Sequence, residues 1–308
     1  MGFARRAEAV ALPAAALLAL LFHATLPGRL PDQADYEAAA AVVAREKQPG
    51  DALLLHPWWT ERARLFAPED VAVVGYLGSD GAPLERAPRI WVLSQPDLPR
   101  AGTAGFWEAF SPGRTAVGEE RRFGTLRLSL FRNGRFRPTA FSAAQALGRA
   151  RAYVESPSGQ HAVECAPDGR GGLHCPGSPA GAQVGWHEVR FEPRRCLHLF
   201  PPGGQDRLVV ELPEVPAADR LSLEAGLVWE RAAYTHQHLR PTFVGVDDAS
   251  GRTLAQVSIA PGEEGFRRDV RPGLAAGPLR VWIRAEVAES REVCADVLAQ
   301  GPAAGGAP

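Results

Sequence analysis

The spacing of apolar positions changes along the chain and divides it into two halves. In the first half, short apolar runs alternate with segments of helical periodicity; the runs cover residues 52–55, 71–74 and 89–93, and the helical segments cover residues 32–47, 58–66 and 103–110. Short apolar strands separated by helices are typical of a parallel sheet that is covered on both faces. Residues 115–131 instead resemble a hairpin or a pair of long strands, and Leu126, Leu128 and Leu130 alternate with polar residues, which predicts an antiparallel edge. We therefore expect an α/β three-layer, incomplete Rossmann-like domain over residues 31–135.

Helical periodicity largely disappears after residue 153. Short strand-like segments follow one another, and turn-forming stretches separate them at residues 201–204, 247–251, 261–262 and 272–273. This pattern predicts an all-β antiparallel sandwich, jelly-roll-like, over residues 154–300. Residues 136–153 are expected to form a linker with a short helix, and the small residues of 301–308 a disordered tail.

The first 30 residues carry a targeting pattern. Arg5 and Arg6 precede an apolar run over residues 9–22. A basic start followed by such a run predicts either a secretory signal peptide or a single membrane anchor in the lipid bilayer. In both cases we expect the rest of the chain to be exported. An anchored chain would face the periplasm or the extracellular side of the cell membrane, and a chain with a cleaved signal would be secreted. A buried N-terminal helix is the alternative.

The cysteines agree with export. Cys165, Cys175, Cys196 and Cys294 are even in number, lie in the second half and lack the close C-x-x-C spacing of a zinc site. In an oxidising compartment we pair Cys165 with Cys175, across a Gly- and Asp-rich hairpin, and Cys196 with Cys294, between the first and last strands of the β domain. Two other connectivities, or four buried thiols, remain open.

Charge and motifs narrow the function classes. The chain has 34 basic and 35 acidic residues, a net charge of −1, so it has no overall positive field and we expect no nucleic-acid partner. It has no P-loop and no G-x-G-x-x-G after its first strand, which argues against a nucleotide site. Glutamate pairs such as Glu224 with Glu230 carry no specific signal for glycoside hydrolysis. We assign no catalytic residue and favour a non-catalytic protein.

His56, Trp58 and Trp59 form the first candidate ligand site. They follow the first apolar strand in the order His56-Pro57-Trp58-Trp59, at the carboxyl end where α/β sheets open into a crevice. Indole faces stack on sugar CH groups, and an imidazole can exchange hydrogen bonds with hydroxyls. The alternative is that the tryptophans pack a helix onto the sheet, which Pro57 starts.

Asp247 and Asp248 form the second candidate site. Together with Ser250 they could supply oxygen ligands to calcium, although Asp-Asp-Ala-Ser-Gly is also ordinary turn chemistry. His236 and His238 would share one face of a strand and could contact one metal ion, although no metal motif supports this and a loop is the alternative. Calcium is therefore the one cofactor considered; otherwise we expect none and no metal site.

The first half resembles the soluble extracytoplasmic region of membrane glycosyltransferases of the mannosyltransferase-like GT-C class. The resemblance covers residues 34–131 and rests on the helix at 36–44, on Gln48-Pro49-Gly50-Asp51, on His56-Pro57-Trp58-Trp59 and on the strand 89–93. In that class the catalytic acid and the lipid-linked sugar lie in a multi-spanning part that this chain lacks. The resemblance therefore transfers no catalytic residue.

The second half resembles the galactose-binding-like jelly-roll sandwiches that accompany carbohydrate-active enzymes. The resemblance covers residues 186–298 and rests on LSLEAGLVWE, PTFVGVDDASGRTL and LRVWIRAEV. It implies a carbohydrate-binding-like architecture. We therefore expect an exported, membrane-tethered envelope protein that binds a glycan or an envelope protein through its sandwich. The alternatives are an accessory or soluble part of an envelope glycosyltransferase system, with a pocket near His56, and a structural envelope protein that binds another protein.

Overall fold

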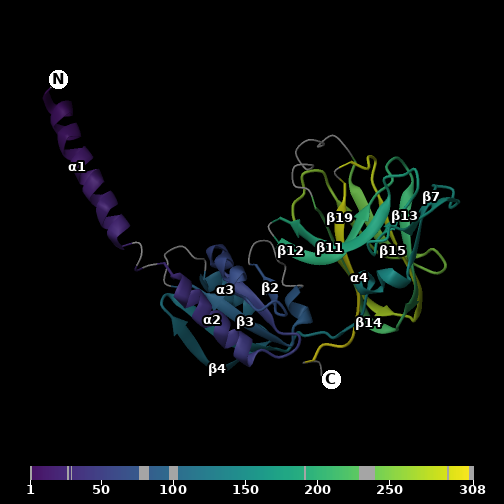
Figure 1. Ribbon diagram of the computed structural model, residues 1–308, viewed down its shortest axis with the longest axis horizontal. Helices are drawn as coiled ribbons and strands as arrows, with labels where there is room; N and C mark the ends of the chain where they lie inside the picture. The colour runs from purple at the N-terminus through teal and green to yellow at the C-terminus, as the bar shows by residue number, and fades with distance from the viewer. Residues whose placement is uncertain are drawn as a thin grey trace. The chain divides into compact units, whose positions relative to one another are not determined.

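The computed structural model describes residues 2–25, 28, 30–75, 83–96, 103–190, 192–228, 240–289 and 291–304 (Figure 1). The chain divides into two compact units. We call Met1–Tyr76 with Ala87–Gly134 the N-terminal unit, and Leu77–Arg86 with Arg135–Pro308 the sandwich unit. The second unit thus includes a short stretch of the first half of the sequence, which the apolar pattern had assigned to the first domain.

A five-stranded sheet organises the N-terminal unit, in the order β2-β1-β3-β5-β4. Its strands are β1 (Ala52–His56), β2 (Ala72–Val74), β3 (Arg89–Ser94), β4 (Arg114–Phe123) and β5 (Leu126–Asn133). Strand β1 pairs in parallel with β2 and β3, whereas β5 pairs antiparallel with β3 and β4. The apolar runs and the alternating segment therefore form the parallel and antiparallel pairs that their patterns predicted.

Helices pack on the two faces of this sheet. Helix α2 (Gln33–Glu46) begins at Asp32, whose side chain accepts a hydrogen bond from the Asp35 backbone, and its Tyr36 joins a core with Leu53 and Leu55 of β1. Helix α3 (Thr103–Phe110) contacts His56, which alternates with these leucines on the strand. Residues 58–66 were predicted to be α-helical, but Trp58–Leu65 form the 3-10 helix η2.

Buried Asp51 fixes the entry to β1. Its carboxylate accepts hydrogen bonds from the Gln48 backbone at 3.0 Å, from Arg89 at 2.9 and 2.6 Å, and from the Trp91 indole at 2.9 Å. Gly50 precedes it with φ of 83°, the left-handed conformation that glycine adopts without strain. Residues 48–51 therefore form a turn in which the charge of Asp51 is neutralised by Arg89.

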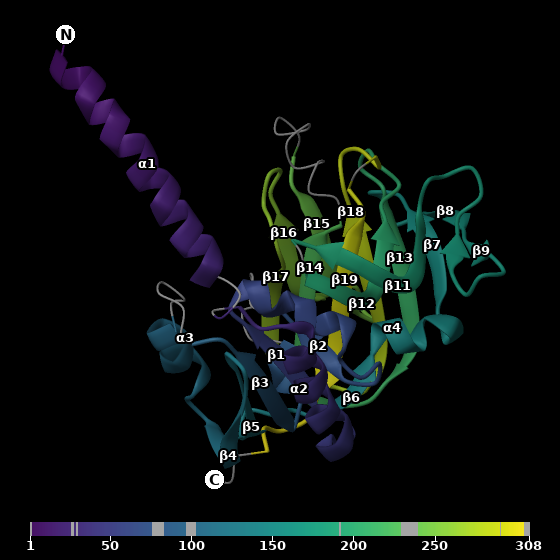
Figure 2. The ribbon, with the colours of Figure 1, turned by 60° about the vertical axis from the view of Figure 1, so that its left-hand side comes forward.

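The sandwich unit consists of two antiparallel sheets (Figure 2). The eight-stranded sheet has the order β17-β14-β19-β12-β11-β10-β9, with β6 also paired to β19, and the six-stranded sheet has the order β16-β15-β18-β13-β7-β8. The strands of the first sheet are β6 (Thr139–Ser142), β9 (Ala166–Pro167), β10 (Leu173–His174), β11 (Gly181–Val189), β12 (Glu192–Phe200), β14 (Ala218–Leu227), β17 (Arg267–Leu274) and β19 (Val293–Gln300). Those of the second are β7 (Arg151–Glu155), β8 (His161–Glu164), β13 (Arg207–Val215), β15 (Thr242–Asp248), β16 (Thr253–Ile259) and β18 (Gly277–Arg284).

One apolar core joins the two sheets. Leu197 and Leu223 of the eight-stranded sheet and Leu208 and Val281 of the six-stranded sheet belong to it, and all four are fully buried. The predicted antiparallel β-sandwich is therefore confirmed. The short elements of the unit are η3 (Pro83–Arg86), α4 (Ala143–Ala146) and η4 (Leu147–Arg149).

Both predicted disulfides are present, Cys165–Cys175 around the β9–β10 hairpin and Cys196–Cys294 between β12 and β19. The second joins neighbouring strands of one sheet. We had expected Cys196 on the first strand of the β domain, but β12 follows several other strands of the unit. The tail predicted to be disordered is held over part of its length, because the Gly301 and Ala304 amides donate to the carbonyls of Pro138 and Phe136.

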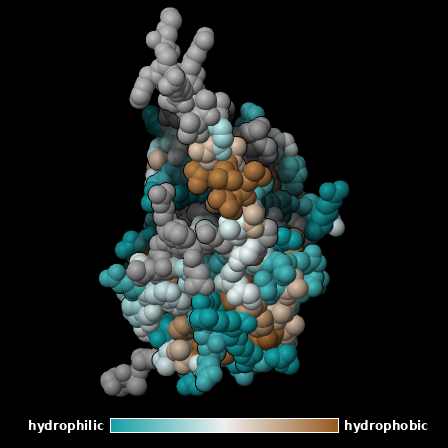
Figure 3. All heavy atoms as spheres, turned by 90° about the vertical axis from the view of Figure 1, so that its left-hand side faces the viewer, coloured by the Kyte–Doolittle hydropathy of each residue, from teal (hydrophilic) through white to brown (hydrophobic). Residues whose placement is uncertain are grey.

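Helix α1 (Gly2–Thr25) exposes large apolar side chains over its second half, including Leu17, Leu18 and Phe22. They form the brown area of its surface (Figure 3). Among the helices that the structure describes, none has the length and apolar character required to cross a membrane. The signal or anchor stays a prediction.

We expect Asp51→Ala to destabilise the N-terminal unit by about 3–5 kcal/mol, because it removes the carboxylate of a buried ion pair with Arg89 and the acceptor of the Trp91 indole. Urea unfolding with hydrogen exchange of the β1 and β3 amides measures the loss. The matched control is Asp70→Ala, since Asp70 forms an exposed ion pair with Lys47. An equal effect of both substitutions would contradict the role of Asp51.

Candidate functional site

His56 lies inside the joint between β1 and α3. Its ring is 0% exposed and stacks on Phe106 with 3.8 Å between ring centroids. Burial lowers its pKa to about 4, so the ring is neutral at physiological pH. The half-buried Trp59 donates its indole N–H to Gln95 Oε1 at 2.8 Å. Trp58 lies in η2, and its side chain is outside the described residues. These contacts describe a packed joint, and a ligand role for the three residues stays a prediction.

Asp247 and Asp248 do not act together. Asp247 is buried on the outer face of the six-stranded sheet, where it accepts from the Trp282 indole at 2.8 Å and from Arg207 at 3.2 Å. The indole lies against Gly245, where a Cβ atom would collide with the ring. The carboxylate of Asp247 therefore accepts hydrogen bonds from side chains of its own sheet.

Asp248 organises the turn that follows. Its Oδ1 accepts from the Ser250 hydroxyl at 2.6 Å and from the Ser250 and Arg252 amides, and these bonds lower its pKa to about 2. Within the described ranges, no three His, Cys, Asp or Glu side chains converge as a metal site would require. His236 and His238 lie outside those ranges. A calcium site at Asp247 and Asp248 has no geometric support.

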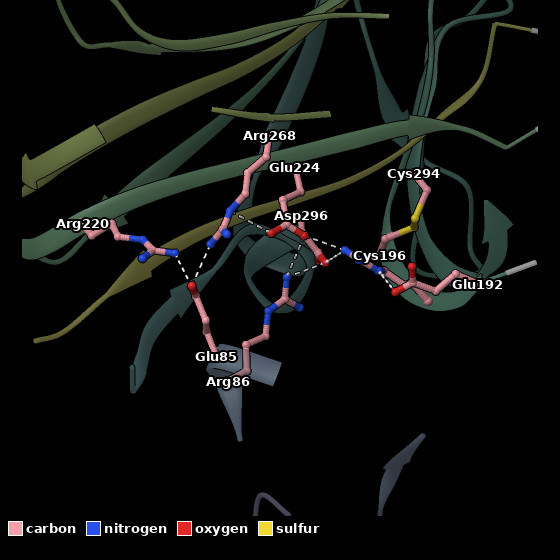
Figure 4. A network of polar contacts seen from close by, with 10 residues as sticks. Glu85, Arg86, Glu192, Cys196, Arg220, Glu224, Arg268, Cys294 and Asp296 are labelled. Carbon is pink, nitrogen blue, oxygen red and sulfur yellow. Dashed lines mark hydrogen bonds and ion pairs between the residues drawn. A yellow bond between two sulfur atoms is a disulfide. The ribbon is translucent and has the colours of Figure 1, made fainter. Parts of the chain in front are cut away.

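A network of partly buried charges lies on the outer face of the eight-stranded sheet (Figure 4). Its centre is Arg194 of β12, which is 8% exposed and donates to Glu192 at 2.8 Å and to Glu224 of β14 at 2.6 Å. Burial opposes the charge of Arg194, but the carboxylates of Glu192 and Glu224 outweigh it and raise its pKa. Glu224 is thus an ion-pair partner rather than a free carboxylate.

Helix η3 extends this network. Glu85 accepts from Arg220 of β14 at 2.5 Å and from Arg268 of β17 at 2.8 Å. Arg86 donates to Asp296 of β19 at 2.8 Å. We call the four arginines and four carboxylates the charge network: Glu85, Arg86, Glu192, Arg194, Arg220, Glu224, Arg268 and Asp296. Its four positive and four negative charges balance.

A polar hollow of about 610 Å³ adjoins the charge network. Strand β14 pairs along the whole of one edge of β19, so β12 and β6 share the other edge, at residues 293–295 and 298–300. The hollow lies at the gap between them. Its walls carry Arg86, Thr139, Ser142, Gln145, Arg195 and Asp296, with Leu147, Val184 and Leu298 among the apolar members. This volume lies in the range of ligand pockets, which commonly span about 300–1,000 Å³.

Trp186 stands beside this hollow. It pairs with Arg195 across β11 and β12, and its side chain lies on the same face as Val184, which lines the hollow. Trp186 is 71% exposed, the highest value among the large apolar side chains described in the sandwich unit. Arg195 is also exposed and forms no ion pair among the residues described. An exposed indole beside a free guanidinium at a polar hollow is the candidate binding site.

Sequence reasoning missed this site. Trp186 shares a face of β11 with the core residue Ala182, so strand alternation alone would predict its burial. The signal was the change from apolar to charged along that face, since Glu188 follows Trp186 and Arg195 lies opposite it. That change marks where the covered part of the inner face ends.

Below pH 6.5 the buried His198 is expected to weaken the fold. The His198 Nδ1 atom forms a hydrogen bond with Gln183 Nε2 at 3.1 Å. Burial and the neighbouring His187 lower the pKa of His198 to about 3. The unfolded chain therefore binds more protons between pH 6.5 and 3, so the free energy of unfolding is highest above 6.5 and falls with pH. Urea unfolding at pH 7 and pH 5 measures this loss, which should shrink in His198→Gln; an unchanged loss would contradict the role of His198.

Comparisons with known proteins complete the description. No family model matches the chain, and no curated protein matches it either. Among solved structures, the K1 adhesin domain of Lys-gingipain from Porphyromonas gingivalis is similar at 10% identity and a TM-score of 0.30, over 53% of this chain and 99% of that one. A family 16 carbohydrate-binding module is similar at 12% identity and a TM-score of 0.26, over 41% and 87% of the two chains.

A third structure, the mannan-recognising carbohydrate-binding module TmCBM27, has 11% identity and a TM-score of 0.26, over 41% of this chain and 85% of that one. Likenesses of this size carry no argument for function. The case for a ligand rests on Trp186, Arg195 and the hollow beside them.

Proposed function

We propose that this protein is an exported, non-catalytic component of the cell envelope that binds a glycan through its β-sandwich. The observation that carries the proposal is the exposed Trp186, paired across the strands with Arg195, which lines the polar hollow and forms no ion pair among the described residues. The charge network supports it, because its ion pairs join η3, β12 and β19, which contribute Arg86, Arg195 and Asp296 to the walls of the hollow. Rigid sites lose less conformational freedom on binding.

Saccharides match this combination of groups. A sugar ring has a flat apolar CH face and a rim of hydroxyls. The indole of Trp186 offers a flat apolar surface, while Thr139, Ser142 and Gln145 offer neutral donors and acceptors for hydroxyls. Leu147, Leu298 and Val184 provide apolar contact for CH groups. A purely apolar ligand would leave these polar groups without partners.

The cellular placement is part of the proposal. The Cys165–Cys175 and Cys196–Cys294 disulfides support an oxidising compartment. Arg5 and Arg6, followed by the apolar residues of α1, support export and tethering of the protein at the cell membrane.

The proposal also covers the class of each unit. The packing of α2 and α3 on the sheet supports an incomplete Rossmann-like, three-layer N-terminal domain, and the two antiparallel sheets support a galactose-binding-like jelly roll. None of the similar structures reported above supports the resemblance of residues 34–131 to membrane glycosyltransferases. The full burial of the His56 ring gives no support to a role in glycosyl transfer.

We expect Trp186→Ala to weaken glycan binding at least tenfold, about 1.4 kcal/mol or more, because it removes the stacking surface. Glycan-array binding followed by titration calorimetry of the positive saccharides measures the change. Thermal unfolding should be unaltered, since an exposed side chain contributes little to stability. The matched control is Val270→Ala, an exposed apolar side chain of β17 in the same sheet.

Two outcomes would overturn the proposal. One is a wild-type protein that binds no saccharide on the array. The other is a Trp186→Ala variant that binds as tightly as the wild type.

A further inference from the structure

The charges around the hollow are unequal. Arg86, Arg195 and Asp296 are its charged wall residues. Asp296 is 4% exposed, and its carboxylate contacts Arg86 at 2.8 Å and Arg194 at 3.8 Å. Its negative charge is therefore already neutralised by two arginines. No unpaired carboxylate among the described wall residues remains to repel an anion.

Arg195 is the surplus cation. The charge network is balanced without it, and Arg195 joins no ion pair within the described part of the chain. On the neighbouring strand β11, the acidic side chain on the same face as Arg195 is Glu188, which lies opposite Pro193 and does not line the hollow. The Arg195 guanidinium thus adds positive charge at the place where Trp186 offers a stacking surface.

We propose that the glycan is acidic, with a uronic acid residue that stacks on Trp186 and pairs its carboxylate with Arg195. This inference rests on the proposed function and specifies the substrate class of that site. A guanidinium donates two parallel N–H bonds to a carboxylate, so Arg195 recognises both the charge and the planar shape of the group. Thr139, Ser142 and Gln145 then remain for the ring hydroxyls.

The geometry separates the roles of the two arginines. Arg86 is 29% exposed in its side chain and holds Asp296, so it positions the wall of the hollow. Arg195 forms no ion pair with the described residues, so its guanidinium is available to a ligand. Substitution of Arg195 should therefore change ligand preference without changing the fold.

Paired saccharides test the charge directly. Oligosaccharides of galacturonate and of glucuronate are titrated by calorimetry beside their methyl esters, which keep the ring and lose the charge. We expect the wild type to bind at least one acid at least tenfold more tightly than its ester. We expect this preference to weaken as salt is added, because part of the attraction is between charges.

Arg195 variants assign the preference to this residue. Arg195→Gln should bind acid and ester equally, whereas Arg195→Lys should keep part of the preference because it keeps the charge. Arg190→Gln is the matched control, because Arg190 is exposed and forms its ion pair with Glu264 away from the hollow. Thermal unfolding verifies that each variant is folded.

The outcomes distinguish the two proposals. Equal binding of acids and esters by the wild type, or a preference that survives in Arg195→Gln, overturns the acidic ligand and leaves glycan binding intact. Binding of neutral saccharides alone also overturns the acidic ligand and leaves glycan binding intact. Absence of binding to every saccharide, acidic or neutral, overturns both proposals.

Discussion

The sandwich unit depends on how the buried guanidinium of Arg194 is neutralised. A charge with so little exposure is tolerated only when carboxylates surround it, and removal of one partner of such a pair is strongly destabilising. Its partners come from three strands, since Glu192 lies on β12, Glu224 on β14 and Asp296 on β19. The three strands must therefore keep their register for the charges to meet. The Cys196–Cys294 disulfide fixes β12 to β19 beside them.

The hollow follows from the same arrangement. Strand β12 leaves the edge of β19 after residue 295, and β6 joins it at residue 298, so Asp296 lies where neither strand pairs. Ion pairs from Arg86 and Arg194 hold Asp296 at this break. The edge of β19 can thus lack a paired strand at Asp296 while the neighbouring strands keep their register. An opening of this kind gives a ligand access to a rigid part of the fold, where β-sandwiches are otherwise packed.

Local chemistry made much of the fold predictable. The strand periodicities, the Asp32 cap, the turn around Asp248 and the Cys165–Cys175 disulfide, whose cysteines are 10 residues apart, follow from residue type and short-range spacing. The Cys196–Cys294 disulfide spans 98 residues and was predicted as a pairing of an early with a late strand of the β domain. The charge network was not predictable, because Glu224 and Asp296 sit in strands whose alternation does not say what faces them. Trp186 was missed for a related reason: alternation assigns a side chain to a face but does not tell how far the opposite sheet covers that face. His56 was placed correctly at the end of its strand, yet its exposure depended on Phe106, about 50 residues later.

The position of η3 has a consequence for how this chain can be divided. Residues 77–86 belong to the sandwich unit, although N-terminal-unit segments precede and follow them. The polypeptide therefore passes between the units three times, and no single cut separates them. A fragment that starts at residue 135 would lack Glu85 and Arg86, and would leave Arg220 and Asp296 without those partners. Recombination therefore cannot transfer the complete sandwich unit as one continuous segment, because the helix η3 is encoded between two segments of the N-terminal unit.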